Sequence, residues 1–309
     1  MGAGGVGGFI GAKLALAGND VAFIARGAHL DALKRNGLEL GGIEPAHLTN
    51  VVAAERPDAF EPPDLIAFCV KLYDTHVAAE LLKPVISPQT VVLTLQNGIE
   101  SSATLAGHFG ANQVLGGAAY FPANITAPGT VTYLGKIADK PHVAFGEPGG
   151  GASARANQIA SVFREAGLVV EVAQDTERML WEKFLLIAGT SAATSLCRMA
   201  IGGVRSDPDR RWLLRSAVAE ARDVASACGI ELGNDVVDTV VAALDGNPAD
   251  GKSSQLVDLE NGKRLELEGL SGAVVRLGQA HNVATPVHRT VYAALKAFAN
   301  PEPRTGSHA

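Results

Sequence analysis

A glycine-rich segment opens the chain and has the residue types that bind phosphate. Gly2-Ala3-Gly4-Gly5-Val6-Gly7 fits the pattern G-x-G-x-x-G. Glycines in this pattern let the backbone approach a pyrophosphate, and the first amides of the helix that follows would point at it. The pattern alone is a weak signal, because glycine-rich openings also occur by chance or in linkers. Its context strengthens it: a helix over 8–17, the turn Gly18-Asn19-Asp20 and a strand over 21–25 complete a βαβ half. We therefore expect the backbone of Gly2, Gly4, Gly5, Val6 and Gly7 to bind a dinucleotide.

Arg26 stands at the end of that strand, at the position where the adenosine ribose is read. In NAD-specific proteins an acidic residue accepts hydrogen bonds from the ribose 2′-hydroxyl here. A guanidinium can instead form two charge-assisted hydrogen bonds to a 2′-phosphate. Arg26 thus predicts a preference for NADPH over NADH; the alternative is an exposed arginine in a turn.

The elements that would carry these residues follow an α/β rhythm. Short apolar runs at 21–25, 65–70, 91–95 and 114–119 alternate with helical patterns such as 28–36 and 75–82, which is typical of a parallel sheet. The runs 131–134 and 143–145 predict a further antiparallel pair. A helix over about 153–166 and a strand over 169–172 would close this part at the edge of its sheet. We predict a Rossmann-type, doubly wound sheet domain over residues 1–174.

From Asp175 onward the pattern is almost wholly helical. Periods of 3.6 residues run over about 176–198, 208–228, 234–245, 254–261, 265–280 and 286–299. Gly262 suits a helix end that needs positive φ, and Thr285-Pro286 suits a helix start. An all-α domain over 175–300 and a disordered tail over 301–309 are therefore expected.

One expected element is missing from the sheet. A strand of about five apolar residues should precede the first glycine of the motif, whereas the sequence begins Met1-Gly2. We expect either that this start lies inside the natural reading frame or that the chain was truncated.

Composition excludes several classes of protein. With 309 residues, 47% of them hydrophobic and 19% charged, the chain is expected to be globular, and it has no apolar run of the ~18 residues that a membrane span needs. A net charge of -6 without a dense basic face argues against nucleic acid. The three cysteines and eight histidines are scattered, so neither a disulfide framework nor a metal site is expected. The N-terminus has no secretory signal pattern, which makes the cytoplasm the expected compartment.

Six short motifs follow one another along the chain: the glycine segment, Ile24-Ala25-Arg26-Gly27-Ala28-His29, Cys69-Val70-Lys71, Leu95-Gln96-Asn97-Gly98-Ile99-Glu100, Trp181-Glu182-Lys183-Phe184 and the segment from Ser253 to Glu266. In type and order they resemble the motifs of the ketopantoate reductases (2-dehydropantoate 2-reductases), and the resemblance covers nearly the whole chain.

The resemblance implies hydride transfer from NADPH to the C2 carbonyl of ketopantoate, with Lys183 as the general acid. An ammonium suits this reaction because it stabilises the developing oxyanion and delivers a proton to it. Lys183 lies in an otherwise apolar run, Trp181 to Ala188, where its pKa can fall. Periodicity alone would favour a lysine that extends from an apolar face into solvent.

Other residues would complete the site. Asn97 follows a strand at the carboxyl edge of the sheet, where its amide could bridge the nicotinamide ribose and the substrate; it also fits a plain Asn-Gly turn. By similarity, Lys71 would contact substrate or cofactor, and Glu266 would position the substrate hydroxyl and Lys183. Glu266 could also be only a first-turn glutamate. Ser254 opens a helix and could meet the substrate carboxylate or act as an ordinary N-cap.

The chain departs from the family at three positions. The family carries asparagines four and eight residues after the lysine, whereas Ile187 and Ser191 stand here; we keep Ser191 as a substrate-binding candidate. Asp74 replaces a common glutamine three residues after Lys71. These changes leave the exact keto acid open, because a site loses discrimination when polar partners become apolar.

Three functions therefore remain. The first is an NADPH-dependent reductase of ketopantoate or a related branched 2-keto acid. The second is a protein that binds NADP(H) as a sensor without turnover. The third is a dehydrogenase of a hydroxy acid or an opine. For the first function, the expected partners are NADPH and a small 2-keto acid. Nucleic acid, a membrane and a metal are not expected as partners, and a homodimer is one possible assembly.

Overall fold

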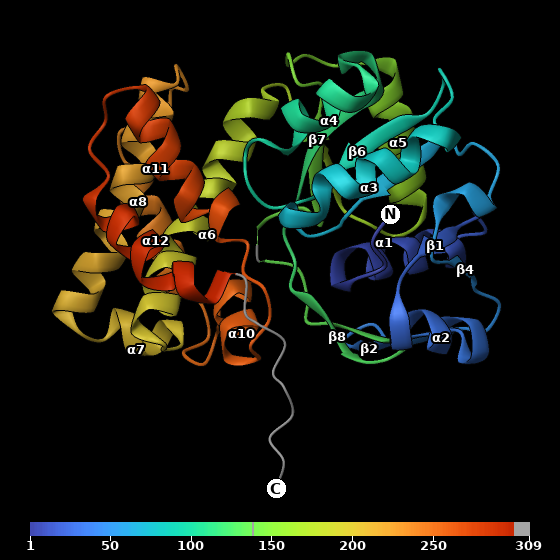
Figure 1. Cartoon of the computed structure of the whole chain (residues 1–309), viewed down its shortest axis with the longest axis horizontal. Coiled ribbons are helices and arrows are strands. Elements are labelled where there is room, and N and C mark those ends of the chain that lie inside the picture. The colour runs from blue at the N-terminus through green and yellow to red at the C-terminus, as the bar shows by residue number, and fades with distance from the viewer. Residues whose placement is uncertain (138, 300–309) are drawn as a thin grey trace, which may run out of the picture. The chain divides into compact units, whose positions relative to one another are not determined.

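The computed structural model describes residues 1–137 and 139–299, and the predicted tail 301–309 lies outside them. Packing divides the chain into two compact units, Met1–Leu180 and Trp181–Ala309. The first contains strands and helices, and the regular elements in the described part of the second are all helices (Figure 1). The predicted fold class, a Rossmann-type α/β part followed by an all-α part, is confirmed.

The strands of the first unit form three sheets. A five-stranded sheet has the order β11-β10-β7-β6-β5, a four-stranded sheet has the order β3-β2-β9-β8, and β1 pairs with β4. The strands are β1 (Ala22–Ile24), β2 (Leu38–Gly42), β3 (Ala46–Leu48), β4 (Val52–Ala54), β5 (Leu65–Phe68), β6 (Val91–Thr94), β7 (Val114–Ala119), β8 (Ala123–Ala127), β9 (Thr130–Tyr133), β10 (Val143–Gly146) and β11 (Val170–Val172).

Helices cover these sheets. α1 packs on β8 and β9 of the four-stranded sheet, where Phe9 stacks on Tyr133 with ring centroids 4.1 Å apart, while α4 packs on β7 and α5 on β11. The helices are α1 (Gly5–Leu16), α2 (Gly27–Asn36), α3 (Thr75–Leu82), α4 (Ser101–Phe109) and α5 (Ala154–Glu165), with short 3₁₀ turns η1 (Pro57–Ala59), η2 (Leu72–Asp74), η3 (Lys83–Val85) and η4 (Ala111–Gln113).

The central strands run parallel, and one predicted pairing is wrong. β5, β6 and β7 are parallel neighbours. The runs 131–134 and 143–145 do not pair, because β9 lies between β2 and β8, while β10 lies between β7 and β11. All four residues of β10 are buried, as suits a strand that has a neighbour on both sides. The run predicted at 169–172 does form the edge strand β11, beside β10.

The first three residues connect two of these sheets. The Met1 amine donates to the Ala67 carbonyl of β5, and the Cys69 amide donates to the Met1 carbonyl, both at 2.9 Å. On the other side, the amides of Gly2 and Ala3 donate to the Ile24 carbonyl of β1 at 3.2 and 2.9 Å. The glycine segment therefore starts at the carboxyl ends of both strands.

The second unit is built on one long helix, α6 (Thr176–Cys197), whose first turn belongs to the first unit. A Cβ added to Gly189 of α6 would lie 2.4 Å from Val218 Cγ2, so glycine allows close contact with α8. The other helices are α7 (Ile201–Arg205), α8 (Pro208–Ala227), α9 (Val236–Asp245), α10 (Ser254–Glu260), α11 (Ser271–Ala280) and α12 (Pro286–Ala299), with the 3₁₀ turn η5 (Leu267–Gly269) before α11. The predicted φ at Gly262 is confirmed at +60°, and α12 begins at Pro286 as expected.

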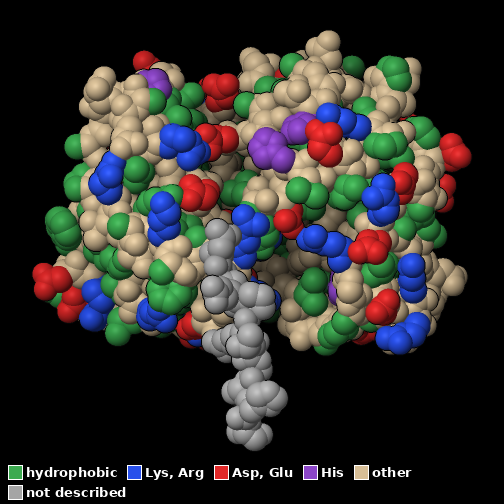
Figure 2. All heavy atoms as spheres, viewed as in Figure 1, with side chains coloured by type: hydrophobic (Ala, Val, Ile, Leu, Met, Phe, Trp, Pro, Cys, Tyr) green, Lys and Arg blue, Asp and Glu red, His purple; other side chains and the backbone are tan. Residues whose placement is uncertain are grey.

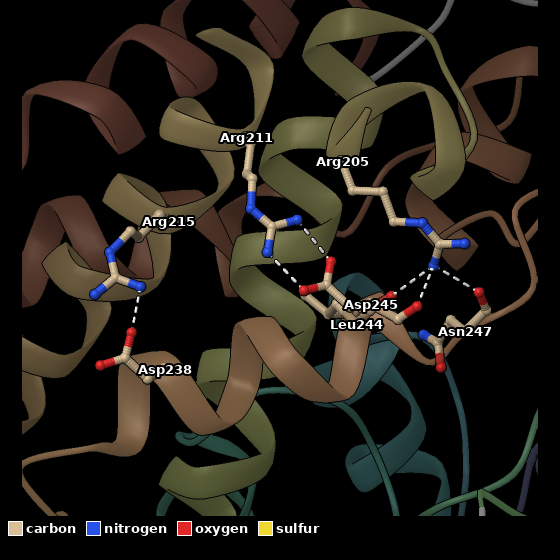
Figure 3. A network of polar contacts seen from close by, with 7 residues as sticks. All are labelled: Arg205, Arg211, Arg215, Asp238, Leu244, Asp245 and Asn247. Carbon is tan, nitrogen blue, oxygen red and sulfur yellow. Dashed lines mark hydrogen bonds and ion pairs between the residues drawn. The ribbon is translucent and has the colours of Figure 1, made fainter. Parts of the chain in front are cut away.

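Arginines connect α9 to neighbouring helices through hydrogen bonds and ion pairs (Figure 3). Arg205 donates from Nη1 to the carbonyls of Leu244, Asp245 and Asn247 at 2.6–3.1 Å, which satisfies acceptors at the end of α9. Arg211 of α8 forms a two-pronged ion pair with the Asp245 carboxylate. These contacts hold the helical unit together at its surface.

The surface carries charged side chains of both signs. Basic and acidic side chains are interspersed over the face drawn in Figure 2. Within the described residues, no helix is both long and apolar enough to cross a membrane. The same residues hold no group of three or more histidine, cysteine, aspartate or glutamate side chains that could hold a metal ion.

Candidate active site

The glycine segment forms a cradle that larger residues would fill. α1 begins at Gly5, and Gly4 at the N-cap position has no side chain with which to cap the first amides. A Cβ on Gly5 would lie 1.8 Å from the Ala123 carbonyl oxygen, and one on Gly7 would lie 2.3 Å from the Gly2 oxygen. A Cβ on Gly4, in contrast, would meet no described atom within 4 Å. Uncapped amides at a helix start beside open space fit a pyrophosphate.

Arg26 follows β1, whose last residue, Ile24, accepts from the amides of Gly2 and Ala3. It occupies the N-cap position of α2, directly after β1, and its side chain is 70% exposed. Its Nη2 donates to Asp74 Oδ2 at 2.7 Å. Arg26 is therefore exposed, as the alternative prediction has it, and it also has a specific partner on η2.

Lys71 and Asn97 follow neighbouring parallel strands, β5 and β6, at the same edge of the sheet. Both are half-buried. Gly98 after Asn97 has φ +90° and lies in a bend of the chain, a conformation that suits glycine.

Gln96 fixes the geometry of this edge. It is 5% exposed, and its Nε2 donates to the Val70 carbonyl at 2.9 Å and to Thr75 Oγ1 at 2.8 Å. The amide therefore joins the end of β6 to the loop that carries Lys71. The sequence shows only that Gln96 is a polar residue after an apolar run; its partners, 26 and 21 positions away, follow from the fold.

In the helical unit, Lys183 is half-buried on α6 and Glu266 is 7% exposed, just before η5. Burial lowers the pKa of Lys183 from 10.5 to about 8, and the charge of Glu266 partly opposes this fall. Removing an ammonium from water disfavours its charged form, and a nearby carboxylate favours it. Lys183 and Glu266 are thus electrostatically coupled, and the lysine pKa lies near neutrality, as suits a proton donor. Glu266 precedes a 3₁₀ turn and does not lie in the first turn of α11.

The serine candidates are placed differently from one another. Ser191 lies two turns after Lys183 on α6 and is 3% exposed, while Ser254 is exposed at the first position of α10. The N-cap of α10 is Ser253, which accepts from the Leu256 amide at 3.1 Å and contacts Thr194 Oγ1 at 2.8 Å. The alternative role of Ser254 as an N-cap is therefore wrong, because its neighbour fills that position.

The predicted residues thus form two groups. The glycine cradle, Arg26, Lys71 and Asn97 gather at the carboxyl ends of strands in the first unit. Lys183, Glu266, Ser191 and Ser254 belong to the second unit, where the first two are coupled. A glycine segment at a helix start on an α/β unit, together with a coupled lysine and glutamate on a helical unit, is typical of a nicotinamide-dependent oxidoreductase.

Comparison with known proteins identifies its family. The profile described as "Ketopantoate reductase PanE/ApbA" matches residues 1–147, and its C-terminal counterpart matches 175–299. A 2-dehydropantoate 2-reductase from Archaeoglobus fulgidus is 35% identical over 291 residues, covering 94% of each chain. The chain belongs to the ketopantoate reductase family.

Solved structures agree with this assignment. A ketopantoate reductase of the same family from Ralstonia eutropha JMP134 has a TM-score of 0.88 at 30% identity and covers 97% of both chains. A 2-dehydropantoate 2-reductase from Geobacter metallireducens GS-15 has a TM-score of 0.89 at 28% identity, covering 96% of this chain and 97% of its own. The expected family, fold and class of enzyme are confirmed.

Proposed function

We propose that this protein reduces 2-dehydropantoate (ketopantoate) to pantoate with NADPH. The observation that carries the proposal is the coupled pair of Lys183 and Glu266, in which burial brings the pKa of the lysine to about 8. Relatives that share 35% of its residues are named 2-dehydropantoate 2-reductases, which supports the same substrate here.

Lys183 is the proposed general acid. NADPH, when bound, supplies a hydride to the C2 carbon of the keto acid. As the carbon–oxygen double bond becomes a single bond, the oxygen gains negative charge. Lys183 stabilises that charge and transfers a proton from Nζ to the oxygen, which leaves the hydroxyl of pantoate and a neutral amine.

Other residues are assigned to binding and positioning. Glu266 keeps Lys183 charged and orients the hydroxyl that forms, while Asn97 and Lys71 contact the nicotinamide end of the cofactor and the substrate. Ser254 and Ser191 are assigned to the substrate. In this proposal residues 1–174 bind NADP(H) and residues 175–300 supply the acid.

Arg26 is assigned to the 2′-phosphate of NADPH. Its guanidinium is exposed at the end of β1, where an arginine can bind a phosphate through two hydrogen bonds. We further propose a cytoplasmic location, a homodimer as the assembly, and small molecules in place of nucleic acid or membrane as partners.

A panel of 2-keto acids tests the substrate. With NADPH and protein held constant, ketopantoate should give the highest kcat/KM. A higher kcat/KM for another branched keto acid would move the assignment to that acid, an outcome that Ile187 and Ser191 would then explain. Tight NADPH binding without oxidation of NADPH by any acid would favour a sensor. Turnover only with hydroxy acids and NADP⁺ would favour a dehydrogenase.

A further inference from the structure

An ion pair stands at the position where the 2′-phosphate would be read. Arg26 Nη2 and Asp74 Oδ2 are 2.7 Å apart, although 48 residues separate them in sequence. Both belong to the first unit. The pair joins the end of β1 to η2, which follows β5.

Asp74 is the better fixed of the two partners. Its side chain is 26% exposed, whereas that of Arg26 is 70% exposed. Its amide donates to the Lys71 carbonyl at 2.9 Å, and the buried Thr75 follows it at the start of α3. Asp74 occupies the N-cap position of α3, yet its carboxylate makes no capping hydrogen bond within the described chain and instead accepts from Arg26. The backbone therefore holds a negative charge beside the guanidinium.

This charge acts against a phosphate in two ways. A 2′-phosphate carries between one and two negative charges near neutral pH, so a carboxylate a few ångströms away repels it. The carboxylate also occupies an Nη2 donor that a phosphate oxygen would use for a bidentate contact. NADH has a hydroxyl at this position and is subject to neither effect, and a carboxylate can accept a hydrogen bond from that hydroxyl.

We propose that Asp74 is a cofactor-specificity residue that narrows the preference for NADPH over NADH. The inference rests on the proposed function, because it takes Arg26 as the residue that reads the 2′-phosphate. Arg26 attracts the phosphate and Asp74 weakens that attraction. The chain should therefore bind NADH better than Arg26 alone would predict.

Direct binding tests this proposal without turnover. Dissociation constants are measured by calorimetry for NADP⁺ and NAD⁺, and for the fragments 2′,5′-ADP and 5′-AMP, at low and high salt. Asp74→Asn keeps the shape of the side chain and removes its charge, and Asp74→Ala is the second variant. Asp238→Asn is the matched control, since Asp238 forms a similar exposed pair with Arg215 in the helical unit.

Asp74→Asn should tighten the binding of NADP⁺ and 2′,5′-ADP by about fivefold or more at low salt, with a smaller gain at high salt. Binding of NAD⁺ and 5′-AMP should stay unchanged or weaken, and Asp74→Ala should act in the same direction. Asp238→Asn should leave the ratio of the dissociation constants for NADP⁺ and NAD⁺ unchanged. Equal changes for both cofactors, or no tightening of NADP⁺, would overturn the role of Asp74.

The failure of this inference can be told from failure of the proposed function. Arg26→Ala should weaken the binding of NADP⁺ and leave the binding of NAD⁺ nearly unchanged. If wild-type protein prefers NADP⁺ through Arg26 and reduces ketopantoate, but Asp74→Asn leaves the ratio as it was, only the inference fails. If wild-type protein binds neither cofactor, both fail.

Discussion

Two opposed influences act on the pKa of Lys183, and in its proposed role as the acid their balance sets the pH at which it gives a proton. Burial lowers its pKa to about 8, and Glu266 acts to raise it. The ammonium form is the acid, so it is abundant below pH 8 and is lost as the pH rises through that value. The rate of keto acid reduction should therefore be nearly constant below pH 8 and fall above it.

Replacing Glu266 by glutamine should move this alkaline limb to lower pH. Without the carboxylate, burial alone acts on Lys183, and its pKa falls further. The measurement is kcat against pH for wild type and Glu266→Gln. Glu268→Gln is the control, because Glu268 is exposed and accepts from the Tyr292 hydroxyl at 2.6 Å. A limb that stays in place or moves to higher pH in Glu266→Gln would contradict the coupling.

For single residues, the sequence indicated which side chains could react, but it did not indicate which residues form hydrogen bonds with each other. Lys183 could be proposed from its motif and its apolar run. The roles of Gln96 and Asp74 could not, because Gln96 binds Thr75 across 21 positions and Asp74 binds Arg26 across 48. Such contacts depend on which strands become neighbours, and one sequence does not specify this.

The start of α1 yields a test at the element scale, because two neighbouring glycines have opposite surroundings. Gly5→Ala would place a Cβ 1.8 Å from a backbone oxygen, whereas Gly4→Ala would place one in open space. Gly5→Ala should displace the helix start and cost roughly 1–3 kcal/mol of unfolding free energy. Gly4→Ala should fold with near-native stability yet bind NADP⁺ at least about tenfold more weakly, because its methyl group occupies the phosphate cradle. Urea unfolding and calorimetry measure the two effects, and tight NADP⁺ binding by Gly4→Ala would refute the cradle.

Two glutamines, Gln96 and Gln113, lie at opposite ends of β6 and allow a role in positioning the site to be told apart from a role in stability. Gln96 ties the carboxyl end of β6 to the Lys71 loop, while Gln113 donates to the carbonyls of Ser87 and Thr90 at 2.6 and 3.2 Å. Each change to leucine should cost about 1–3 kcal/mol in urea unfolding, since it leaves buried acceptors without a donor. Only Gln96→Leu should also raise the KM for NADPH or keto acid. Equal KM values in the two variants would show that Gln96 is merely structural.

The periodicity of apolar residues predicted where some strands lie but not which strands pair. The run predicted at 114–119 coincides with β7 (Val114–Ala119), whose six residues are all buried. The runs around β9 and β10 were predicted as strands, but their predicted pairing was wrong. Both are short and largely apolar, and such a sequence does not indicate which strand lies beside it. The four-stranded sheet was not predicted as a sheet, because β2 and β3 contain glycine, glutamate and histidine and lack a continuous apolar run.

For the whole molecule, a buried histidine links stability to pH. His288 is 0% exposed, and burial lowers its pKa to about 4. Its Nε2 lies 2.9 Å from the Ala217 carbonyl, which can only accept, so Nε2 carries the proton and Nδ1 accepts from Ser271. The Glu220 carboxylate accepts from the amides of Val287 and His288 beside it, and so caps α12.

Acid should therefore weaken the helical unit. The unfolded chain binds a proton at His288 with a pKa near 6.5, and the folded chain does so only near 4. The stability that comes from a neutral His288 is complete above pH 6.5 and is lost as the pH falls toward 4, a loss of up to about 3 kcal/mol. An NMR titration of the ring nitrogens should find His288 neutral at pH 5, and urea unfolding should show the loss. Titration of His288 near pH 6.5 in the folded protein would contradict this.

The two-part architecture was the most predictable property of the molecule. The sequence changes from alternating strands and helices to helical periods alone near Asp175, and α6 (Thr176–Cys197) begins directly after that residue. The division by packing at Leu180 falls within that helix, a boundary that composition and turn signals could not indicate. The functional division at residue 174 remains a proposal.

In the proposed reaction the ammonium of Lys183 protonates a keto acid that NADPH reduces. Single-turnover oxidation of bound NADPH by ketopantoate, in wild type and Lys183→Ala, tests it most directly. The variant should bind NADPH with near-native affinity and lose about 100-fold or more of the rate. A variant that oxidises NADPH at the wild-type rate would contradict the claim.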